Sequence, residues 1–372
     1  MKVFNYEKYK SMALDSEAIS LIAKIYEKKG EQGSYLDKEP EVLSTLVEVS
    51  KIQSTEASNR IEGIVTTTER INALLKRKSK PLNRDEEEIV GYRDVLNTIH
   101  NNHEYIPLSS NYILQLHRDL LKFTSLSYAG KYKNTGNVIA EKDADGNIVR
   151  TIFEPLKPYE TPDAIKEICE QYKKAIGNEF VDPLILIPIV IHDFLCVHPF
   201  NDGNGRMSRL LTLLLLYQNG FTVGKYISIE RIILETKDGP GGYYDSLEKS
   251  GDGWHEGQDN PLYFIKYMLQ VLLRAYREFD ERVVFAAKAV AEEKEKAKKQ
   301  GKKADPASQI QVRRVIDARL GKITKKEIME QLPFISEPTI KLALNALVKD
   351  SYIKVVGTGR NSAYVRTNKG EQ

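Results

Sequence analysis

The sequence predicts a mainly helical protein with one β-hairpin and a small C-terminal module of helices and strands. Two apolar runs rich in Leu and Ile, Pro183 to Val197 and Leu210 to Tyr217, are typical of buried helices, although periodicity alone leaves strands open. Asp145-Gly146-Asn147 stands between strand-like residues, which is a strong hairpin signal. Residues 307–372 contain three short helical patterns followed by two strand-like segments. A chain of 372 residues has room for two or three domains.

Composition restricts the class of protein. Apolar residues make up 41% and charged residues 29% of the chain, which suits a folded core and a hydrated surface. Apolar runs are too short to span a bilayer, and the first residues lack the apolar centre of a signal peptide. Cys169 and Cys196 give no disulfide framework. We therefore expect a cytoplasmic protein without a membrane partner.

The first third of the chain predicts a series of helices. The first helix, Ser16 to Lys29, is expected to end at Gly30, and the second, Glu41 to Arg60, at Gly63. Ser109 or Ser110 is expected to cap the last helix of this series. Three histidines fall on these helices (His100, His103 and His117), where core or surface positions are expected rather than catalysis. The expected bounds are Ser16 to Lys29, Glu41 to Arg60, Thr66 to Arg77, Asn83 to Asn102 and Ser109 to Lys122.

The middle of the chain predicts the hairpin within Gly130 to Pro158 and then further helices. Thr161 is expected to cap a helix that continues to Ile176, with Pro162 at its first position. Ile227 to Glu235 fits either a helix or a strand. Leu262 to Phe279 predicts the last helix of the core, and Lys288 to Lys303 a charged helix or linker.

The C-terminal end is basic, although the whole chain carries a net charge of only +3. Residues 307–372 hold twelve Lys or Arg and six Asp or Glu. Thr324 is expected to cap the second of the three helices, and Ser336 stands before the third. The expected elements are helices at Gln309 to Leu320, Lys325 to Gln331 and Thr339 to Asp350, and strands at Tyr352 to Val356 and Ala363 to Arg366.

The loop between the two apolar runs holds the residues with the most chemistry, His198 to Arg209. Gly203 and Gly205 allow the backbone N–H groups of a helix start to form an anion cradle. Arg206 and Arg209, three apart, share a helix face and can fork onto phosphate oxygens. Asp202 offers a hard oxygen ligand for Mg²⁺, and His198 can take a proton near neutral pH. The set predicts phosphoryl or nucleotidyl transfer from a Mg-nucleotide. A polar helix–helix turn would need neither the histidine nor two arginines.

These residues resemble the signature of the Fic family, His-x-Phe-x-(Asp/Glu)-Gly-Asn-Gly-Arg-x-x-Arg, and every fixed position matches. The resemblance implies the Fic/Doc helical fold with a β-hairpin flap, and transfer of AMP from ATP to a Ser, Thr or Tyr hydroxyl of a protein. His198 would be the catalytic base, Phe200 the anchor of the loop, and Asp202 the Mg²⁺ ligand. The implied nucleotide-binding residues are Glu62, Ile139, His198, Gly203, Asn204, Gly205, Arg206, Met207, Ser208, Arg209, Tyr243 and Tyr244. Some relatives transfer phosphate or phosphocholine, so the transferred group is inferred.

Ser58 and Glu62 resemble the inhibitory motif (Ser/Thr)-x-x-x-Glu-(Gly/Asn) that some family members carry before the core. On residues alone the pattern also fits a plain helix end. In such relatives the glutamate pairs with the second arginine of the signature, here Glu62 with Arg209. Because Arg209 could not serve both Glu62 and the γ-phosphate, ATP would bind weakly or unproductively. The same glutamate aids removal of AMP in some relatives, so reverse chemistry is a further expectation.

In this family a hairpin flap pairs with the main chain of the target protein, and we expect docking on residues 132–153. Thr135 to Ile139 is the expected flap strand. Tyr243 and Tyr244 would border the adenine and ribose, although the run Gly239 to Gly242 is longer than the family usually shows. Gly205 argues against a Doc-like phosphotransferase, because such sequences have Lys there and Gly leaves room for a β-phosphate. Relatives often dimerise, which makes a homodimer an expectation.

The C-terminal pattern resembles a winged helix-turn-helix domain, which some Fic proteins carry. Lys341, Lys349 and Arg360 are compatible with DNA phosphates, so a DNA-binding regulator with a nucleotide-sensing Fic domain is the alternative function. A structural or protein-docking wing fits the moderate charge equally well. The expected division is an N-terminal helical region at 1–105 with the inhibitory helix near 41–63, the catalytic core at 106–285, a charged helical linker at 286–306 and the winged helix at 307–372.

Overall fold

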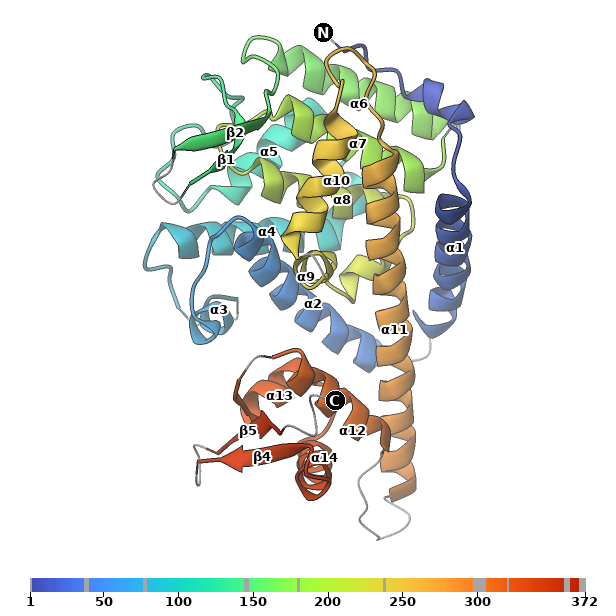
Figure 1. Ribbon diagram of the computed structural model, residues 1–372, viewed down its shortest axis with the longest axis vertical. Helices are drawn as coiled ribbons and strands as arrows, with labels where there is room; N and C mark the ends of the chain where they lie inside the picture. Colours follow the sequence, from blue (N-terminus) through green and yellow to red (C-terminus); the bar gives the residue numbers. More distant parts are fainter. Residues whose placement is uncertain are drawn as a thin grey trace. The chain divides into compact units, whose positions relative to one another are not determined.

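The computed structural model describes the whole chain except residues 1, 37–39, 76–78, 144–146, 179–180, 237–238, 297–305, 320, 358–361 and 368–372. It is mainly helical, as the sequence predicts, and divides into two compact units (Figure 1). The first is Met1–Gln32 with Ser50–Arg277, and the second is Gly33–Val49 with Glu278–Gln372. The domain boundaries expected at residues 105, 285 and 306 stay predictions. In the described part, no helix combines the length and apolar character that a membrane span requires.

The elements up to residue 296 include three short 3-10 helices, at Tyr6–Ser11, His103–Tyr105 and Thr222–Lys225. The two-stranded antiparallel hairpin β1 (Ile139–Lys142) and β2 (Ile148–Phe153) projects from the helical part of the first unit (Figure 1, left). The α-helices are α1 (Ser16–Leu36), α2 (Pro40–Ile61), α3 (Thr68–Leu75), α4 (Arg84–Asn102), α5 (Ser110–Leu120), α6 (Thr161–Gly177), α7 (Pro183–Val197), α8 (Asn204–Gln218), α9 (Ile229–Leu234), α10 (Pro240–Gly251) and α11 (Leu262–Lys296).

Helices α7 and α8 form the centre of the first unit and position the site between them. Asp182 caps α7 by accepting from the N–H of Leu184 at 2.8 Å, and Pro183 takes the first position. Almost every side chain of both helices is buried, in agreement with the apolar runs. Helix α8 also packs against α4, and α7 against α6. The loop of residues 198–203 therefore starts and ends on two rigid, buried elements.

Several helix ends are as the sequence predicts. Gly63, the second residue after α2, has a φ of +77°, and its N–H donates to the carbonyl of Arg60 at 3.0 Å. Ser109 is the cap of α5 and accepts from the N–H of Tyr112. The ambiguous segment Ile227 to Glu235 is helical, as α9. Trp254 is buried (1% exposed) and donates from Nε1 to Asp193 at 2.7 Å.

Other expected bounds are wrong. Gly30 does not end α1, which continues to Leu36, because a helical glycine costs only about 1 kcal/mol relative to alanine. Thr161 is not the cap of α6, since Glu160 holds that position and the Thr161 hydroxyl donates to the carbonyl of Lys157 at 3.0 Å. The flap strand does not start at Thr135; β1 begins at Ile139. The expected turn at Asp145 and Gly146 lies outside the described residues.

The first part of the segment expected to be a charged helix or linker is helical. Helix α11 continues without interruption from Leu262 to Lys296. Its segment after Phe279 is rich in Ala, Glu and Lys, which are strong helix formers. The remainder of the expected linker, residues 297–305, lies outside the described residues.

The second unit contains α12 (Pro306–Asp317), β3 (Ile323–Thr324), α13 (Lys325–Gln331), α14 (Glu337–Lys349), β4 (Ile353–Val356) and β5 (Ala363–Arg366). The strands form an antiparallel sheet in the order β3-β5-β4, and the two-residue β3 was not expected. Thr324 caps α13 in a reciprocal capping box with Glu327. A separate apolar core fills this unit: Phe285, Val312, Ile316, Ile323, Ile328, Leu332, Ile335, Ile340, Ala343, Leu344, Leu347, Tyr352 and Ile353.

Candidate active site

The loop from His198 to Gly203 turns the chain from α7 into α8. His198 has a left-handed backbone (φ 50°, ψ 63°), and Gly203 has a φ of +82° that glycine adopts easily. Asn204 closes the loop from its far end. Its Oδ1 accepts from the N–H of Phe200 at 2.9 Å, and its Nδ2 donates to the carbonyl of Phe200 at 2.8 Å. Phe200 is fully buried, as expected for an anchor.

The His198 ring is oriented so that one nitrogen is available as a base. Its Nδ1 lies 3.3 Å from the carbonyl oxygen of Leu195, which can only accept, so Nδ1 carries the proton. Nε2 then keeps its lone pair. Burial lowers the pKa of His198 to about 4, against the opposing effect of the Leu195 hydrogen bond. The imidazole is therefore neutral at pH 7 and able to accept a proton.

The start of α8 forms the anion cradle and receives the Glu62 carboxylate. Gly203 stands at the N-cap position and gives no side-chain cap. A Cβ on Gly205 would lie 2.2 Å from Oε1 of Glu62, so the carboxylate occupies space that only a glycine leaves open. The carboxylate lies at the positive end of the helix, where an anion is stabilised. Glu62 thus occupies a position suited to a phosphate group.

Arg209 lies one helical turn further along α8 and is buried (3% exposed). Its Nη2 donates to Oε1 of Glu62 at 2.8 Å and to the carbonyl of Ser58 at 2.9 Å, and its Nε donates to Oγ of Ser58 at 2.8 Å. Among the described residues, Nη1 finds no acceptor. An unpaired N–H of a buried guanidinium fits an additional anionic group, such as a phosphate oxygen.

Arg206, Asp202, Glu88 and Arg84 form a charge network on the other side of the loop. Arg206 is almost completely buried and pairs with Glu88 on α4 and, at 3.2 Å, with Oδ1 of Asp202. Arg84 on α4 donates to Oδ2 of Asp202 at 2.7 Å and to Oε1 of Glu88 at 2.6 Å. Neither Glu88 nor Arg84 was expected at the site. The role of Arg206 toward phosphate stays a prediction, since these carboxylates already engage its guanidinium.

The expected role of Asp202 as a Mg²⁺ ligand stays a prediction. Its side chain is one-third exposed, and both carboxylate oxygens already accept from guanidinium N–H groups. A carboxylate is the kind of ligand that Mg²⁺ prefers when it also binds substrate phosphates, and here Arg84 and Arg206 already neutralise its charge. Arg84, which is exposed, would have to move or share the carboxylate.

The remaining predicted nucleotide residues differ in exposure. Tyr243 is buried against Phe264 and Tyr267, and burial raises the pKa of its hydroxyl. Tyr244 is 46% exposed, so of this pair it has the more accessible ring. Ile139 is half-buried at the start of β1. Met207 and Ser208 are fully buried, and the Ser208 hydroxyl donates to the carbonyl of Gly205 at 2.7 Å. Because the side chains of Met207 and Ser208 are buried, only their backbone atoms are available for contact with a nucleotide.

His117 on α5 was expected to be a core or surface residue, and it is a fully buried support of the loop. Its ring stacks on Phe200 with 3.7 Å between centroids and 7° between planes. Nδ1 accepts from the N–H of Gly130 at 3.0 Å, so Nε2 carries the proton and donates to the carbonyl of Asp202 at 3.0 Å. Nothing near His117 in the sequence indicates this contact, because Asp202 lies 85 positions away.

Comparison with known proteins relates part of the chain to a family. Residues 107–216 match the model of the Fic/DOC family. This segment is a Fic/DOC domain. It holds α5, the hairpin, α6, α7, the loop with His198 and most of α8. Glu62, Ser58, Arg84 and Glu88 lie before the matched residues.

Three proteins illustrate the similarity of the chain to others with this domain. Protein adenylyltransferase fic-1 of Caenorhabditis elegans is 26% identical over 141 residues, which are 37% of this chain and 25% of that protein. A probable protein adenylyltransferase of Aquifex aeolicus is 30% identical over 102 residues, 27% of this chain and 31% of that protein. A crystal structure of a Fic family protein from Desulfovibrio desulfuricans has a TM-score of 0.56 at 21% identity, covering 97% of this chain and 99% of that chain.

The chain thus spans about a quarter of one curated relative and a third of the other. The likeness to the solved structure, at this level of identity, shows the Fic fold alone.

Proposed function

We propose that this chain is a protein adenylyltransferase that moves AMP from ATP to a hydroxyl of a protein. The observation that carries the proposal is the pairing of a neutral, oriented His198 with a glycine-lined anion cradle at the start of α8. Two relatives with the domain bear the name protein adenylyltransferase or probable protein adenylyltransferase.

The reaction assigns one task to each group. Nε2 of His198 takes the proton of the target hydroxyl, and the hydroxyl oxygen forms a bond to the α-phosphorus. The bond from the α-phosphorus to the bridging oxygen breaks, and pyrophosphate leaves with that electron pair. The α8 cradle and Arg209 would bind the outer phosphates. Asp202 would hold Mg²⁺, which neutralises phosphate charge when it is bound. Gly205 leaves the space that a β-phosphate needs.

Glu62 restrains this reaction in the proposed function. Its carboxylate lies against Gly205 and pairs with Arg209, so it occupies both phosphate-binding elements at once. ATP and Glu62 would compete for Arg209, and ATP would bind weakly or in an unproductive pose. The same carboxylate could direct water toward an adenylylated hydroxyl, which keeps removal of AMP as a second reaction of this site.

The hairpin is the proposed docking site for the target protein, within residues 132–153. Its exposed apolar side chains include Val138, Ile148 and Val149. As described, the sheet has only two strands, so β1 and β2 each leave one edge to which a target segment can add. Recognition through main-chain hydrogen bonds would make target choice depend on shape more than on one side chain.

Labelled ATP tests the proposed reaction. Purified Glu62→Gly protein is incubated with Mg²⁺ and ATP labelled at either the α- or the γ-phosphate, and covalent label is measured on the protein itself and on added protein. The proposal expects label from the α-phosphate only, and none with the additional change His198→Ala. Label from the γ-phosphate would instead establish a phosphotransferase, and no label from either position would contradict transfer from ATP.

A second function, DNA binding by a winged helix-turn-helix domain, has support in α14. Lys341, Asn345 and Lys349 are exposed at spacings of four and therefore follow one face of this helix. Such a basic stripe suits DNA phosphates. Arg360, also expected to bind DNA, lies outside the described residues. Gel-shift of the full chain with DNA at physiological salt should show a protein–DNA complex, and the double change Lys341→Ala with Lys349→Ala should weaken it. No shift with the unchanged chain would exclude this function.

A homodimer stays a prediction, for which light scattering is the direct test.

A further inference from the structure

Lys133 is a buried lysine that the reaction described above does not use. It lies in the segment that leads from α5 to the hairpin, and it is only 3% exposed. Its Nζ donates to the carbonyl of Val197 and to Oδ1 of Asn137, both at 2.9 Å. Its own backbone N–H donates to the carbonyl of Pro199 at 2.8 Å. Lys133 therefore binds main-chain oxygens on both sides of His198.

The contact with Val197 has a clear electrostatic basis. Val197 is the last residue of α7, and the carbonyls of a last helical turn lack partners within the helix. A positive charge at this end complements the helix dipole. Two other carbonyls of the same turn serve His198, whose N–H donates to Phe194 at 2.9 Å and whose Nδ1 donates to Leu195 at 3.3 Å. The end of α7 is thus a set of acceptors arranged around the base.

Asn137 extends the same arrangement into the loop. Its Nδ2 donates to the carbonyl of Phe200 at 3.2 Å, while its Oδ1 receives the Lys133 ammonium. Lys133 and Asn137 together bind the carbonyls of Val197, Pro199 and Phe200, which surround a histidine in a left-handed conformation. A non-glycine residue keeps such a conformation only where its surroundings enforce it. Both residues stand shortly before β1, so the turn with the base is joined to the hairpin.

The charge of Lys133 also acts on His198. In the described part of the chain, the two charged groups that act on the imidazole are Lys133, which lowers its pKa, and Glu62, which raises it, both after the larger effect of burial. Burial lowers the pKa of Lys133 itself to about 8, against the effect of Glu160. The ammonium is therefore largely charged at pH 7.

We propose that Lys133, together with Asn137, is a positioning residue for the base: it holds the left-handed turn that carries His198 and joins this turn to the hairpin that would receive the target protein. The kinetic test of this inference measures the transfer of AMP, so that test rests on the proposed function. It assigns no contact between Lys133 and the nucleotide.

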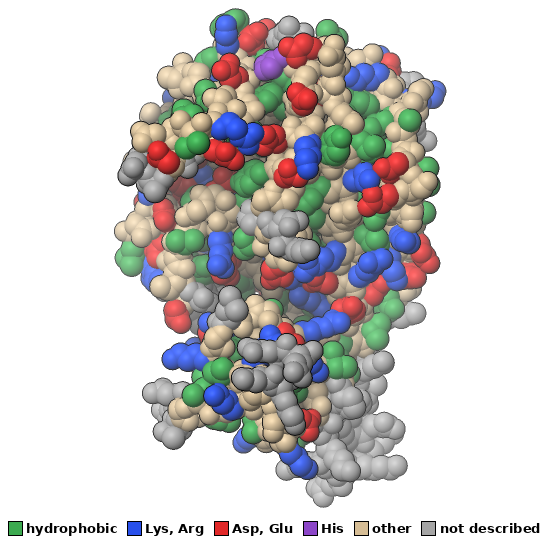
Figure 2. Space-filling view, viewed as in Figure 1, with side chains coloured by type: hydrophobic (Ala, Val, Ile, Leu, Met, Phe, Trp, Pro, Cys, Tyr) green, Lys and Arg blue, Asp and Glu red, His purple; other side chains and the backbone are tan. Residues whose placement is uncertain are grey.

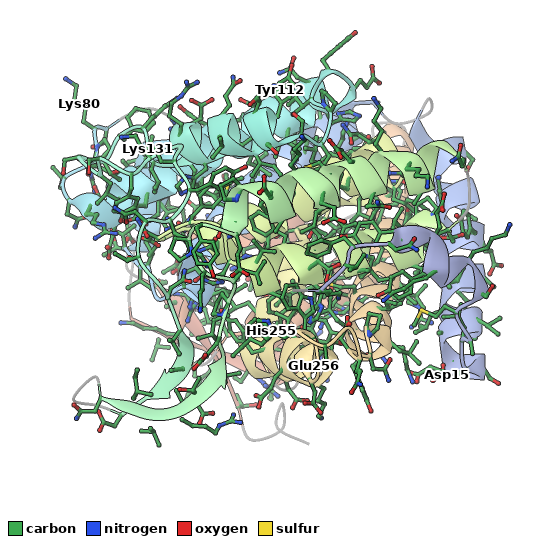
Figure 3. All side chains as sticks on the ribbon, turned by 90° about the horizontal axis from the view of Figure 1, so that it is seen from above. Asp15, Lys80, Tyr112, Lys131, His255 and Glu256 are labelled. Carbon is green, nitrogen blue, oxygen red and sulfur yellow. The ribbon has the colours of Figure 1, made fainter. Side chains whose placement is uncertain are left out.

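The kinetic test uses Lys133→Met in the Glu62→Gly background, with α-labelled ATP and self-modification as the readout. We expect kcat to fall by about tenfold or more, because a displaced base loses its alignment, while the ATP concentration for half-saturation changes less than about twofold. Lys133→Arg should restore part of kcat. Lys131→Met is the matched control, since Lys131 is exposed and lies two positions away (labelled in Figure 3). Its Nζ donates to the carbonyl of Ser127 at 2.9 Å.

A second readout does not depend on transfer. Titration of ¹⁵N-histidine-labelled protein by NMR follows His198, identified by its loss in His198→Ala. In the Glu62→Gly background, Lys133→Met should raise the pKa of His198 and alter the Nδ1 signal, and Lys131→Met should do neither. If the parent protein transfers nothing while Lys133→Met shifts His198, the proposed function fails and the positioning role stands.

The inference is overturned if folded Lys133→Met keeps both its kcat and the titration of His198. If Lys133→Met does not fold, Asn137→Ala takes its place, because it removes the bond to Phe200 while leaving the ammonium. It should then lower kcat by several-fold without changing half-saturation. An unchanged kcat for folded Asn137→Ala would also contradict the inference.

Discussion

Replacing Glu62 with glycine should release the site and can be quantified from the contacts of Arg209. Glu62 gives Arg209 one charge-assisted hydrogen bond of 2.8 Å, with the glutamate side chain 29% and the arginine side chain 3% exposed. Such a bond to a charged group contributes about 1.5–3 kcal/mol. If ATP must displace it to reach Arg209, its removal should strengthen productive ATP binding by roughly 10- to 150-fold.

The geometry of Arg209 should survive the change. Its Nε and Nη2 remain bound to Oγ and the carbonyl of Ser58, so the guanidinium keeps its orientation. Glycine is tolerated at position 62 because α2 has already ended at Ile61. Removal of the carboxylate leaves a buried cation with less compensation, so the protein without nucleotide should unfold at a lower temperature. Mg-ATP should then raise the unfolding temperature of Glu62→Gly more than that of the unchanged protein.

Calorimetric titration with Mg-ATP, thermal unfolding and α-labelled self-modification form the assay. Glu62→Gln is the matched variant, because it keeps the length of the side chain beside Gly205 and removes only its charge. It should give a smaller gain than Glu62→Gly. Equal ATP affinity and equal self-modification in all three proteins would refute the competition at Arg209, although the fold and the role of His198 would stand.

Three further changes probe other parts of the site. In Gly205→Ala, the new Cβ would lie 2.2 Å from Oε1 of Glu62 and should displace the Glu62 carboxylate. The same Cβ would fill the space of the phosphate, so self-modification should stay low, whereas Glu62→Gly should raise it. Burial lowers the pKa of His117 from 6.5 to about 4, so the folded protein keeps this ring neutral at pH values where the unfolded chain protonates it. Because the unfolded chain then binds more protons, the free energy of unfolding should fall by about 3 kcal/mol between pH 6.5 and pH 4. Urea unfolding should show a shallower pH dependence for His117→Asn than for His255→Asn, a change at an exposed site (labelled in Figure 3). Asp202→Asn should raise the Mg²⁺ concentration for half-maximal transfer by roughly tenfold or more, measured by Mg²⁺ titration.

The part of the site that lies in one stretch of sequence could be predicted. His198, Asp202, Gly203, Gly205 and Arg209 come from a single loop and the helix that follows it, so their spacing determines that they meet. The structure places all five around the turn between α7 and α8.

The supporting residues could not be predicted, because tertiary packing brings them to the loop. Glu88 and Arg206 are 118 positions apart, and Lys133 and Val197 are 64 apart. His117 carries no local motif, and its position in the sequence is equally compatible with an ordinary core residue. The pairing of Glu62 with Arg209, 147 positions apart, was expected only through the resemblance to the family.

The wrong element bounds have local physical reasons. Gly30 is weakly unfavourable in a helix, and a small local cost does not end α1. Strand β3 has two residues, too few for any alternation of side chains to appear in the sequence.

The face of the molecule in Figure 2 shows acidic and basic side chains interspersed over much of its area, so the modest net charge of the chain gives little indication of a partner.

The most direct test of the account compares ATP with ADP, because only ATP has the γ-phosphate that would compete with Glu62 for Arg209. Calorimetry gives the ratio of their affinities, with Mg²⁺, in the unchanged protein and in Glu62→Gly. The account predicts that the unchanged protein binds ATP no more tightly than ADP, and that Glu62→Gly favours ATP by roughly tenfold or more. The same ratio in both proteins would contradict the claim that Glu62 withholds Arg209 from the nucleotide.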